Sequence, residues 1–490
     1  MKKFINLVSF TSNQVKIETT NQRYQHLKKI YAFLATLLIC NGSIAQNTSD
    51  LKQQANQYLA EMEQFLCTTS DSIWTFSEPT LGEYKTVNLL KEILVDQGFS
   101  IRDSVAGFET MFIAAFGTKG PTIALLAEGD ADSPLVPQQG FWLPDSQYGQ
   151  AAGHHLLATG SLGTVLTLKE LIKNGGLEAQ LMYVFSTGEG SFGGRVPLVR
   201  AGYFSEVDLA FFWHPAPVTT ASLSQWDAIL DVEVAYPNTQ ESHKNIQQLW
   251  ALADSIKQEY GNNLLLRTKI KNTAFDLAIP NDSLKIHLRI EHPNQEQAVE
   301  IYHRIVKKLR SDKPDSPHFQ VFRAVHEFIP NLAGNQLAYS NMTKLPTRKI
   351  LDSDLELAQK IWHTTQKDDG RFLTNVLPFK ENKTKSLYGY GSDIGDVSWH
   401  VPLISIVTSC FPTGVSMRNW EGATFGQTQY AKDGMLHAAK AMVFTSIDYL
   451  TNKEIQKQIH GEFEQRVRNR IYQDSIGIRT NEFSYKRRSY

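Results

Sequence analysis

The sequence predicts an α/β fold, in which a split α/β domain with a central mixed sheet is interrupted by a smaller α+β domain. Two observations predict it. Short, nearly continuous apolar segments alternate with helical segments in both outer parts of the chain, as expected for strands that are buried on both faces. Between these parts, strand and helix patterns follow one another in the order β-α-β-β-α-β. The 490 residues are enough for two or three domains of ordinary size.

The first outer part begins with an amphipathic helix from Leu51. A later helix ends before Gly175-Gly176, because glycine is the usual residue after a helix C-terminus. We expect helices at residues 87–96 and 155–174, and strands at 111–116, 122–127, 181–185 and 209–213.

The middle part contains a strand in which Leu284, Ile286, Leu288 and Ile290 alternate with polar residues, which indicates a sheet with one buried face. The expected order is strand 229–236, helix 245–260, strand 264–270, strand 284–290, helix 295–309 and strand 319–328. This order is the split βαβ arrangement of a ferredoxin-like domain. Helices at 354–366 and 435–450, with a strand at 403–407 between them, then return to the first domain.

These patterns divide the chain into five segments. We expect a leader at 1–45, the first part of the α/β domain at 46–221, the inserted domain at 222–329, the second part of the α/β domain at 330–455 and a basic tail at 456–490. The tail is rich in Arg and Lys with little apolar content, so we expect a solvated terminus, with contact to a polyanion as the alternative.

The leader has the order of a secretory signal. Basic residues at 26–29 precede an apolar stretch at 30–39 and small residues up to Ala45, so we expect cleavage near Ala45 and export to the periplasm or the medium. The apolar stretch is shorter than the roughly 20 residues that span a bilayer, which argues against a stable membrane span. The alternatives are a later translation start and a disordered leader before a buried helix.

Composition excludes some classes of partner and site. Lys and Arg total 49 against 50 Asp and Glu, so no chain-wide field exists to hold a nucleic acid. Three cysteines are too few and too scattered for a cysteine-ligated metal. After cleavage only Cys67 and Cys410 would remain, and an oxidising compartment could pair them.

Polar residues follow the predicted buried strands at the points where ligands bind in open α/β sheets. The segments are Glu128-Gly-Asp130-Ala-Asp132, Gly153-His154-His155, Thr187-Gly-Glu189 and His214-Pro215. Imidazole and carboxylate groups are ligands of Zn²⁺ and similar ions, and a carboxylate beside such an ion can take a proton from bound water. The pattern favours metal-assisted hydrolysis, although paired histidines before a helix and a histidine before proline also serve in capping and turns.

Several motifs, taken together, resemble those of a known family. They are Glu78-Pro-Thr-Leu-Gly-Glu83, Gly107-Phe-Glu-Thr110, Ile123 to Ala131, Ala152-Gly-His154, Gly188-Glu189, Trp213-His-Pro215, Ile329-Pro-Asn331 and Gly391 to Trp399. Their order along the chain and their residues are similar to those of the M20-type metallo-amidohydrolases, and among these to the aminobenzoyl-glutamate hydrolase (utilization) B subunits. The resemblance extends from about residue 47 to residue 450.

The resemblance implies a zinc-peptidase-like catalytic domain and an inserted lid that often mediates dimerisation. It also implies a site with two divalent ions, Zn or Mn, that hydrolyses the amide bond of an acyl- or aminobenzoyl-amino acid or a small peptide. No organic cofactor is implied. The expected partners are a small amide or peptide and, through the lid, either a second copy of the chain or a paired subunit.

The family's site residues are only partly kept here. By the resemblance, His154 and His214 occupy metal-ligand positions, Glu189 is the general base, and Asp130 orients a ligand histidine. Three other ligand positions, a cysteine, a glutamate and a histidine in the family, are occupied by Ala152, Gly190 and Arg418. Divalent metal binding is therefore expected to be weak or absent.

The lid departs from the family as well. The family histidine after the first lid strand is missing, and His243 is a poor substitute because it lies near a predicted helix start. Asp276 and Glu291 replace an asparagine and an arginine near the family's substrate. We expect them to repel a substrate carboxylate.

Three functional hypotheses follow. The first is an exported hydrolase with an altered, one-metal site. The second is a catalytically inactive relative that binds a small amide, a peptide or a partner, with Arg418 in place of the ion's charge. The third is a structural partner of an active paralogue. The missing ligands favour the second, unless other residues compensate, for which the candidates are Glu128, Asp132, His155, Asp393, Asp396 and His400.

Overall fold

The computed structural model describes residues 20–131, 133–136, 138–221, 223–237, 239–261, 264–270, 283–310, 316–367, 369–385, 391–468, 470 and 472. Of the residues discussed above, Asp132, Asp276, residues 1–19 of the predicted leader and residues 473–490 of the predicted tail lie outside this range, as do the side chains of residues 20–47 and of His243. Residues 1–51 and 52–490 form two compact units. Helix α1, Thr20–Phe76, runs through the predicted cleavage point at Ala45.

A six-stranded mixed sheet is the centre of the α/β domain. Its strand order is β1-β2-β6-β3-β7-β14. Strands β6, β3, β7 and β14 are parallel, whereas β1 and β2 are antiparallel additions at one edge. The bounds are β1 Ser100–Arg102, β2 Phe112–Phe116, β3 Thr122–Ala127, β6 Gln180–Phe185, β7 Leu209–Ala216 and β14 Leu403–Ser409. The predicted central mixed sheet is thus confirmed.

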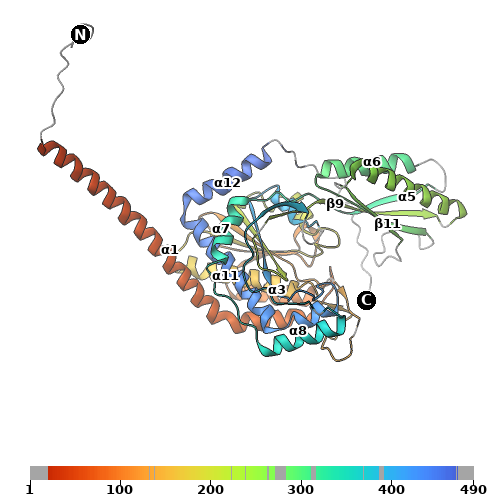
Figure 1. Cartoon of the computed structure of the whole chain (residues 1–490), viewed down its shortest axis with the longest axis horizontal. Helices are drawn as coiled ribbons and strands as arrows, with labels where there is room; N and C mark the ends of the chain where they lie inside the picture. Colours follow the sequence, from red (N-terminus) through yellow and green to blue (C-terminus); the bar gives the residue numbers. More distant parts are fainter. Residues whose placement is uncertain are drawn as a thin grey trace, which may run out of the picture. The chain divides into compact units, whose positions relative to one another are not determined.

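Helices pack on this sheet (Figure 1). Helix α3, His154–Lys173, contacts β3, β6 and β7 and is buried around most of its circumference, as expected of a helix that is apolar on nearly every side. Helix α11, Gln429–Thr451, contacts α3 and β14. The other helices of this domain are α2 Tyr84–Asp96, α4 Arg195–Arg200, α7 Leu332–Met342, α8 Asp352–Thr365, α9 Ile394–Ser398, α10 Trp420–Phe425 and α12 Lys453–Val467, with a 3₁₀ turn at Val105–Gly107.

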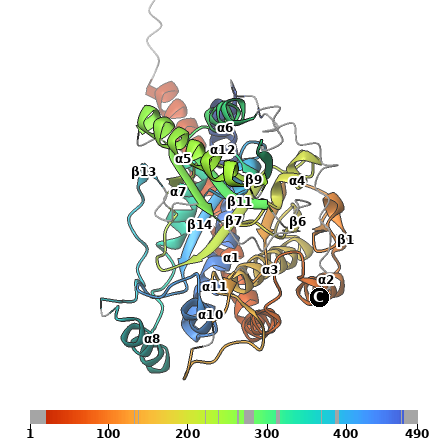
Figure 2. The same cartoon turned by 90° about the vertical axis from the view of Figure 1, so that its right-hand side faces the viewer.

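The inserted domain, which we call the lid, has the predicted order β9-α5-β10-β11-α6-β12. Its four-stranded sheet, in the order β10-β11-β9-β12, is antiparallel throughout, and both helices lie on one face of it (Figures 1 and 2). Alternate residues of β9 such as Leu230 and Val232 join the apolar core beneath the helices. The bounds are β9 Ala228–Pro237, α5 Gln240–Tyr260, β10 Leu265–Ile270, β11 Ser283–His292, α6 Gln295–Leu309 and β12 His318–Val325.

Small elements complete the fold, and some differ from expectation. Strand β7 continues to Ala216, two residues past His214. Helix α12 occupies residues that were assigned to the solvated tail, and its Ile459 is fully buried. Two short pairs, β4 Ser133–Pro134 with β5 Tyr148–Gly149 and β8 Leu223–Gln225 with β13 Glu381–Lys385, lie outside the main sheets.

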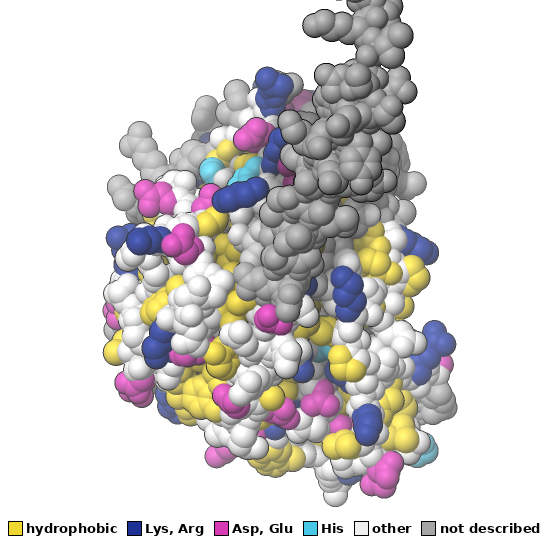
Figure 3. Space-filling model, turned by 90° about the vertical axis from the view of Figure 1, so that its left-hand side faces the viewer, with side chains coloured by type: hydrophobic (Ala, Val, Ile, Leu, Met, Phe, Trp, Pro, Cys, Tyr) yellow, Lys and Arg dark blue, Asp and Glu magenta, His cyan; other side chains and the backbone are white. Residues whose placement is uncertain are grey.

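The thiols of Cys67 and Cys410 are free and buried, so the cysteine pair considered from the sequence is not formed here. Among the described residues, no helix combines the length and the apolar character needed to cross a bilayer. On the face drawn in Figure 3, acidic and basic side chains of the described residues are interspersed.

Candidate metal centre

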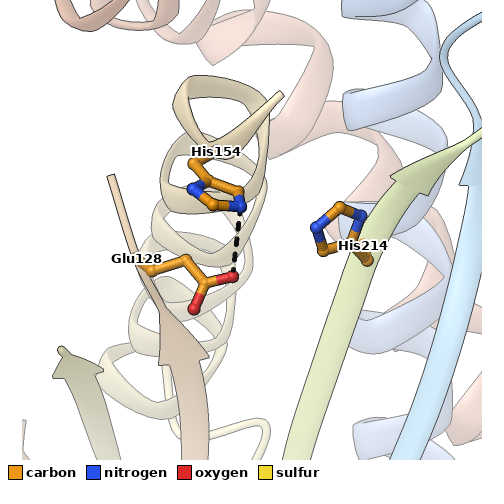
Figure 4. A group of neighbouring side chains, drawn as sticks. All are labelled: Glu128, His154 and His214. Atoms are coloured by element: carbon orange, nitrogen blue, oxygen red, sulfur yellow. Dashed lines mark ion pairs between the residues drawn. The ribbon is translucent and has the colours of Figure 1, made fainter. Parts of the chain in front are cut away.

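The carboxyl ends of the parallel strands bring three ligand-type side chains together (Figure 4). Glu128 directly follows β3, His214 lies near the end of β7, and His154 is the first residue of α3. Because β3 and β7 are parallel neighbours, the ends of both strands lie at the same edge of the sheet.

Gly153 sets the entry into α3. Its φ of 86° lies in the left-handed region, which glycine adopts without a steric penalty. A Cβ at this position would also lie 3.1 Å from side-chain atoms of Pro215. The glycine thus allows the chain to turn closely against β7 and to present His154 at the start of the helix.

Asp130 orients His154. The Nδ1 atom of His154 lies 2.9 Å from the carbonyl oxygen of Asp130 and 3.0 Å from its Oδ1 atom. Carbonyl and carboxylate oxygens only accept, so Nδ1 carries the hydrogen and Nε2 is the basic nitrogen of the ring. The hydroxyl of Thr80 donates to the other carboxylate oxygen of Asp130 at 2.7 Å, which fixes the carboxylate in turn.

His214 is held in the same tautomer. Its Nδ1 atom donates to the carbonyl oxygen of Pro215 at 2.7 Å, which leaves Nε2 as the basic nitrogen. Burial and the neighbouring His154 lower the pKa of His214 to about 4, so the ring is neutral at pH 7. The two imidazole rings are 5.6 Å apart and nearly perpendicular.

One ligand atom from each of Glu128, His154 and His214 lies within 4.8 Å of the other two. The Oε1 atom of Glu128 is buried without a hydrogen-bond partner and lies 3.6 Å from Nε2 of His154. This distance is too long for a hydrogen bond. It is close to the roughly 3.4 Å that separates two ligand atoms about 2.1 Å from one ion in a tetrahedral site. The Glu128–His154 pair therefore has a spacing that two ligands of one ion can have, and a carboxylate with two imidazoles is a set of donor types that binds Zn²⁺.

The second oxygen of Glu128 is held by a buried arginine that sequence reasoning missed. Nη2 of Arg195 donates to Oε2 of Glu128 at 2.8 Å, and Nη1 donates to Oδ1 of Asp393 at 2.7 Å. Burial raises the pKa of Glu128 to about 7, although Arg195 and His154 oppose this shift. Arg195 follows Glu189 by only six residues, so a position near the same sheet edge was predictable, but no pattern in the sequence indicates that the arginine is buried.

Glu189 lines a cavity of about 300 Å³ beside His214. Burial would raise the pKa of Glu189, but Arg323 and the hydroxyl of Ser392 outweigh this effect and lower it. Arg323 comes from β12 of the lid, and its Nη2 atom lies 4.0 Å from Oε1 of Glu189. Glu189 is therefore a carboxylate at neutral pH. Neither Arg323 nor Ser392 was singled out from the sequence.

Ala152, Gly190 and Arg418 occupy the positions at which the resemblance implies family ligands. Ala152 is buried and Arg418 is exposed, and both line the cavity. The charge of Arg418 contributes to the lowered pKa of His214. Gly190 is exposed, and a Cβ built there would meet no atom within 4 Å.

The remaining candidate ligands have other surroundings. His155 lies 3.0 Å from the carbonyl oxygen of Gly426, and burial lowers its pKa to about 3. Asp396 accepts from the backbone N–H of His326, and the ring of that histidine contacts the carboxylate as well. None of His155, Asp393, Asp396 and His400 belongs to the described ligand group, whereas Glu128 does.

Comparison with known proteins agrees with the fold. No protein-family model matches the chain. The B subunit of the p-aminobenzoyl-glutamate hydrolase of Escherichia coli K12 is 25% identical over 440 residues, which cover 81% of this chain and 91% of that protein. This match supports the resemblance to the M20 aminobenzoyl-glutamate hydrolases that the motifs indicate.

Two further matches bear on this assignment. The structure of an aminobenzoyl-glutamate utilization protein from Klebsiella pneumoniae matches with a TM-score of 0.53 and 12% identity, over 81% of this chain and 99% of that structure. This match supports the fold. The N-acetyl-L-cysteine deacetylase of Bacillus subtilis 168 is 25% identical over 170 residues, or 34% of the chain and 40% of that protein. The recognition made from the motifs is thus confirmed.

Proposed function

We propose that this protein hydrolyses the amide bond of an acyl- or aminobenzoyl-amino acid or a small peptide at a one-metal site. Glu128, His154 and His214 would hold the ion. The observation that carries the proposal is the buried Oε1 atom of Glu128, which has no hydrogen-bond partner and faces the basic nitrogen of His154 at 3.6 Å. A divalent ion there would polarise the substrate carbonyl and lower the pKa of bound water.

Glu189 would act as the general base. Its lowered pKa keeps it ionised and able to accept a proton, and it lines the same cavity as His214. Asp130 holds His154 in the tautomer that offers Nε2, and the carbonyl of Pro215 does the same for His214.

The cavity suits an acyl group with an apolar or aromatic body. Two residues of its wall are charged, Arg418 and Glu189, and two are polar, His214 and Ser392. The other wall residues are apolar: Ala152, Phe212, Pro215, Ala216, Pro217, Trp226, Val407, Val415 and Met417. If the protein is a hydrolase, Arg418 in the cavity wall would attract a substrate carboxylate.

The non-catalytic hypothesis remains the second candidate. The observation that favours it is the guanidinium of Arg418 in the cavity wall, where it lowers the pKa of His214 and opposes a cation. The ligand count that favoured this hypothesis from the sequence included only His154 and His214. Glu128 raises the count to the three protein ligands that catalytic zinc sites usually have.

We also propose, from the sequence order of the leader, that the protein is exported after cleavage near Ala45. Pairing through the lid, with a second copy or with a different chain, is supported by the Escherichia coli relative, which is one subunit of a hydrolase. Both proposals are independent of the metal site, so either can be wrong while the proposed metal site stands.

One experiment separates the two functions. Purified, chelator-treated protein is supplied with Zn²⁺, Mn²⁺ or Co²⁺ and tested for hydrolysis of p-aminobenzoyl-glutamate and N-acyl amino acids. Metal-dependent hydrolysis that is lost in Glu189→Gln supports the hydrolase. Absence of metal uptake at micromolar ion, with a ligand still stabilising the fold, supports the binding protein and overturns the hydrolase.

A further inference from the structure

Arg195 is a fully buried cation beside the candidate metal centre. It is the first residue of α4, and its relative exposure is 0%. Its guanidinium donates to Glu128 at 2.8 Å and to Asp393 at 2.7 Å, and its backbone N–H donates to the second oxygen of Asp393 at 2.7 Å. Asp393 therefore fixes both ends of the arginine, and the arginine fixes Glu128.

The guanidinium also contacts the strand that carries the other ligand. Its carbon atom lies 5.2 Å from the ring centre of Phe212, within the range of a cation–π contact. Phe212 and His214 are two residues apart on β7, so their side chains lie on the same face of the sheet, and their rings are 6.1 Å apart. Arg195 thus contacts both Glu128, which follows β3, and Phe212, which lies beside His214 on the same face of β7.

This arrangement decides which oxygen of Glu128 faces the histidines. Arg195 occupies Oε2, so Oε1 is left to face Nε2 of His154. One guanidinium shared by two carboxylates leaves the three groups with a net negative charge when both acids are ionised. The guanidinium is shared between Glu128 and Asp393, so it orients Glu128 without being paired with that carboxyl group alone.

We infer that Arg195 is a positioning residue that fixes Glu128 as the third protein ligand of the metal centre. The inference rests on the proposed one-metal site. Lysine cannot replace the arginine, because one ammonium group does not provide the planar, forked donors that bind two carboxylates while stacking on Phe212. Partners that orient metal ligands typically contribute 10- to 100-fold to metal affinity.

The test uses Co²⁺ as the probe and the full chain as the sample. Competition against a chromophoric chelator measures the Co²⁺ affinity, and the visible spectrum of bound Co²⁺ is the second readout. Variants are Arg195→Lys, Glu128→Gln and the double variant, with Arg200→Lys as the matched control at the other end of α4. We expect Arg195→Lys to weaken Co²⁺ binding about 10- to 100-fold and to change the spectrum. We expect no change in Arg200→Lys, and little further loss when Arg195→Lys is added to Glu128→Gln.

Two results overturn the inference while the proposed function stands. One is Co²⁺ affinity in Arg195→Lys equal to that of the wild type. The other is a loss of Co²⁺ affinity from Arg195→Lys that is as large in the Glu128→Gln background as in the wild type, since the arginine would then not act through Glu128. Failure of the wild type to bind Co²⁺ overturns the proposed function and the inference together.

A second variant covers the case in which Arg195→Lys does not fold. Asp393→Asn keeps an acceptor oxygen for Arg195 but weakens the contact that fixes it. We expect a several-fold loss of Co²⁺ affinity that disappears in the Glu128→Gln background. A folded Asp393→Asn protein with unchanged affinity and spectrum contradicts the positioning role.

Discussion

The Oε1 atom of Glu128 lies 3.6 Å from the Nε2 atom of His154, and neither Ala152 nor Gly190 provides a ligand in their neighbourhood. Glu128 and His154, together with His214, offer a carboxylate and two imidazoles within 4.8 Å of one another, and the three residues are the ligands of the proposed one-metal site. It leads to predictions about metal binding, proton transfer and stability.

Glu128→Gln should reduce the affinity for Zn²⁺ by at least about tenfold, because the amide has no charge and is a poor ligand. The matched control is Glu83→Gln. Glu83 is a buried carboxyl outside the ligand group, with its pKa raised by burial and by Asp130, so Glu83→Gln makes the same substitution at a buried position without removing a proposed ligand. Zn²⁺ competition against a chelator measures both variants, and equal affinities in the two would exclude Glu128 as a ligand.

Restoring the family residues should create a second metal position. The triple variant Ala152→Cys, Gly190→Glu and Arg418→His supplies a thiolate, a carboxylate and an imidazole, and the open space at position 190 accommodates a side chain. We expect the stoichiometry to rise from one ion to two per chain, as determined by elemental analysis after gel filtration. A folded triple variant that still binds one ion would argue that these positions do not surround a common site.

Arg323→Met should shift the acid limb of kcat/KM to higher pH. Arg323 contributes to the lowered pKa of Glu189, so its loss raises that pKa and the base becomes protonated at a higher pH than in the wild type. The pH profile of hydrolysis measures the shift. Arg323→Lys keeps a cation and should retain most of the wild-type profile, so equal shifts in both variants would contradict an effect of charge.

Asp231→Asn should destabilise the lid sheet in a pH-dependent way. Despite its burial, Asp231 has a lowered pKa because it is bonded to His287 and Arg289. Its contribution is therefore present above the unfolded pKa of about 3.9 and is lost as the pH falls through the folded value. We expect the variant to lose about 3 kcal/mol of unfolding free energy at pH 7.

Urea unfolding at pH 7 and pH 3 tests this expectation. The difference between Asp231→Asn and the wild type should be smaller at pH 3, since the aspartate begins to gain a proton in the unfolded state and then in the folded state. A difference that is independent of pH would show that packing, and not charge, is responsible.

The strands and long helices were predictable because burial leaves a local pattern. Helix α6 was predicted with its observed bounds at 295–309, and β3 at 122–127, since apolar periodicity and apolar length are properties of neighbouring residues. The short helices α4, α9 and α10 have too few turns to show a period. Helix α12 was hidden by its charged composition.

The site was partly predictable for a related reason. Glu128, His154, Glu189 and His214 follow buried strands or begin a helix at the ligand-binding edge, so their positions could be read locally. Arg195 and Arg323 could not be identified this way, because an arginine is usually exposed and only the tertiary fold brings each one to a carboxylate.

Metal loading of the wild-type chain is the direct test of the proposed one-metal site at Glu128, His154 and His214. Chelator-treated protein is titrated with Zn²⁺ at neutral pH, and bound metal is counted alongside the hydrolysis of p-aminobenzoyl-glutamate. We expect one ion per chain and hydrolysis that appears in proportion to the bound ion. No bound ion at micromolar Zn²⁺, or two ions per chain, would contradict this expectation.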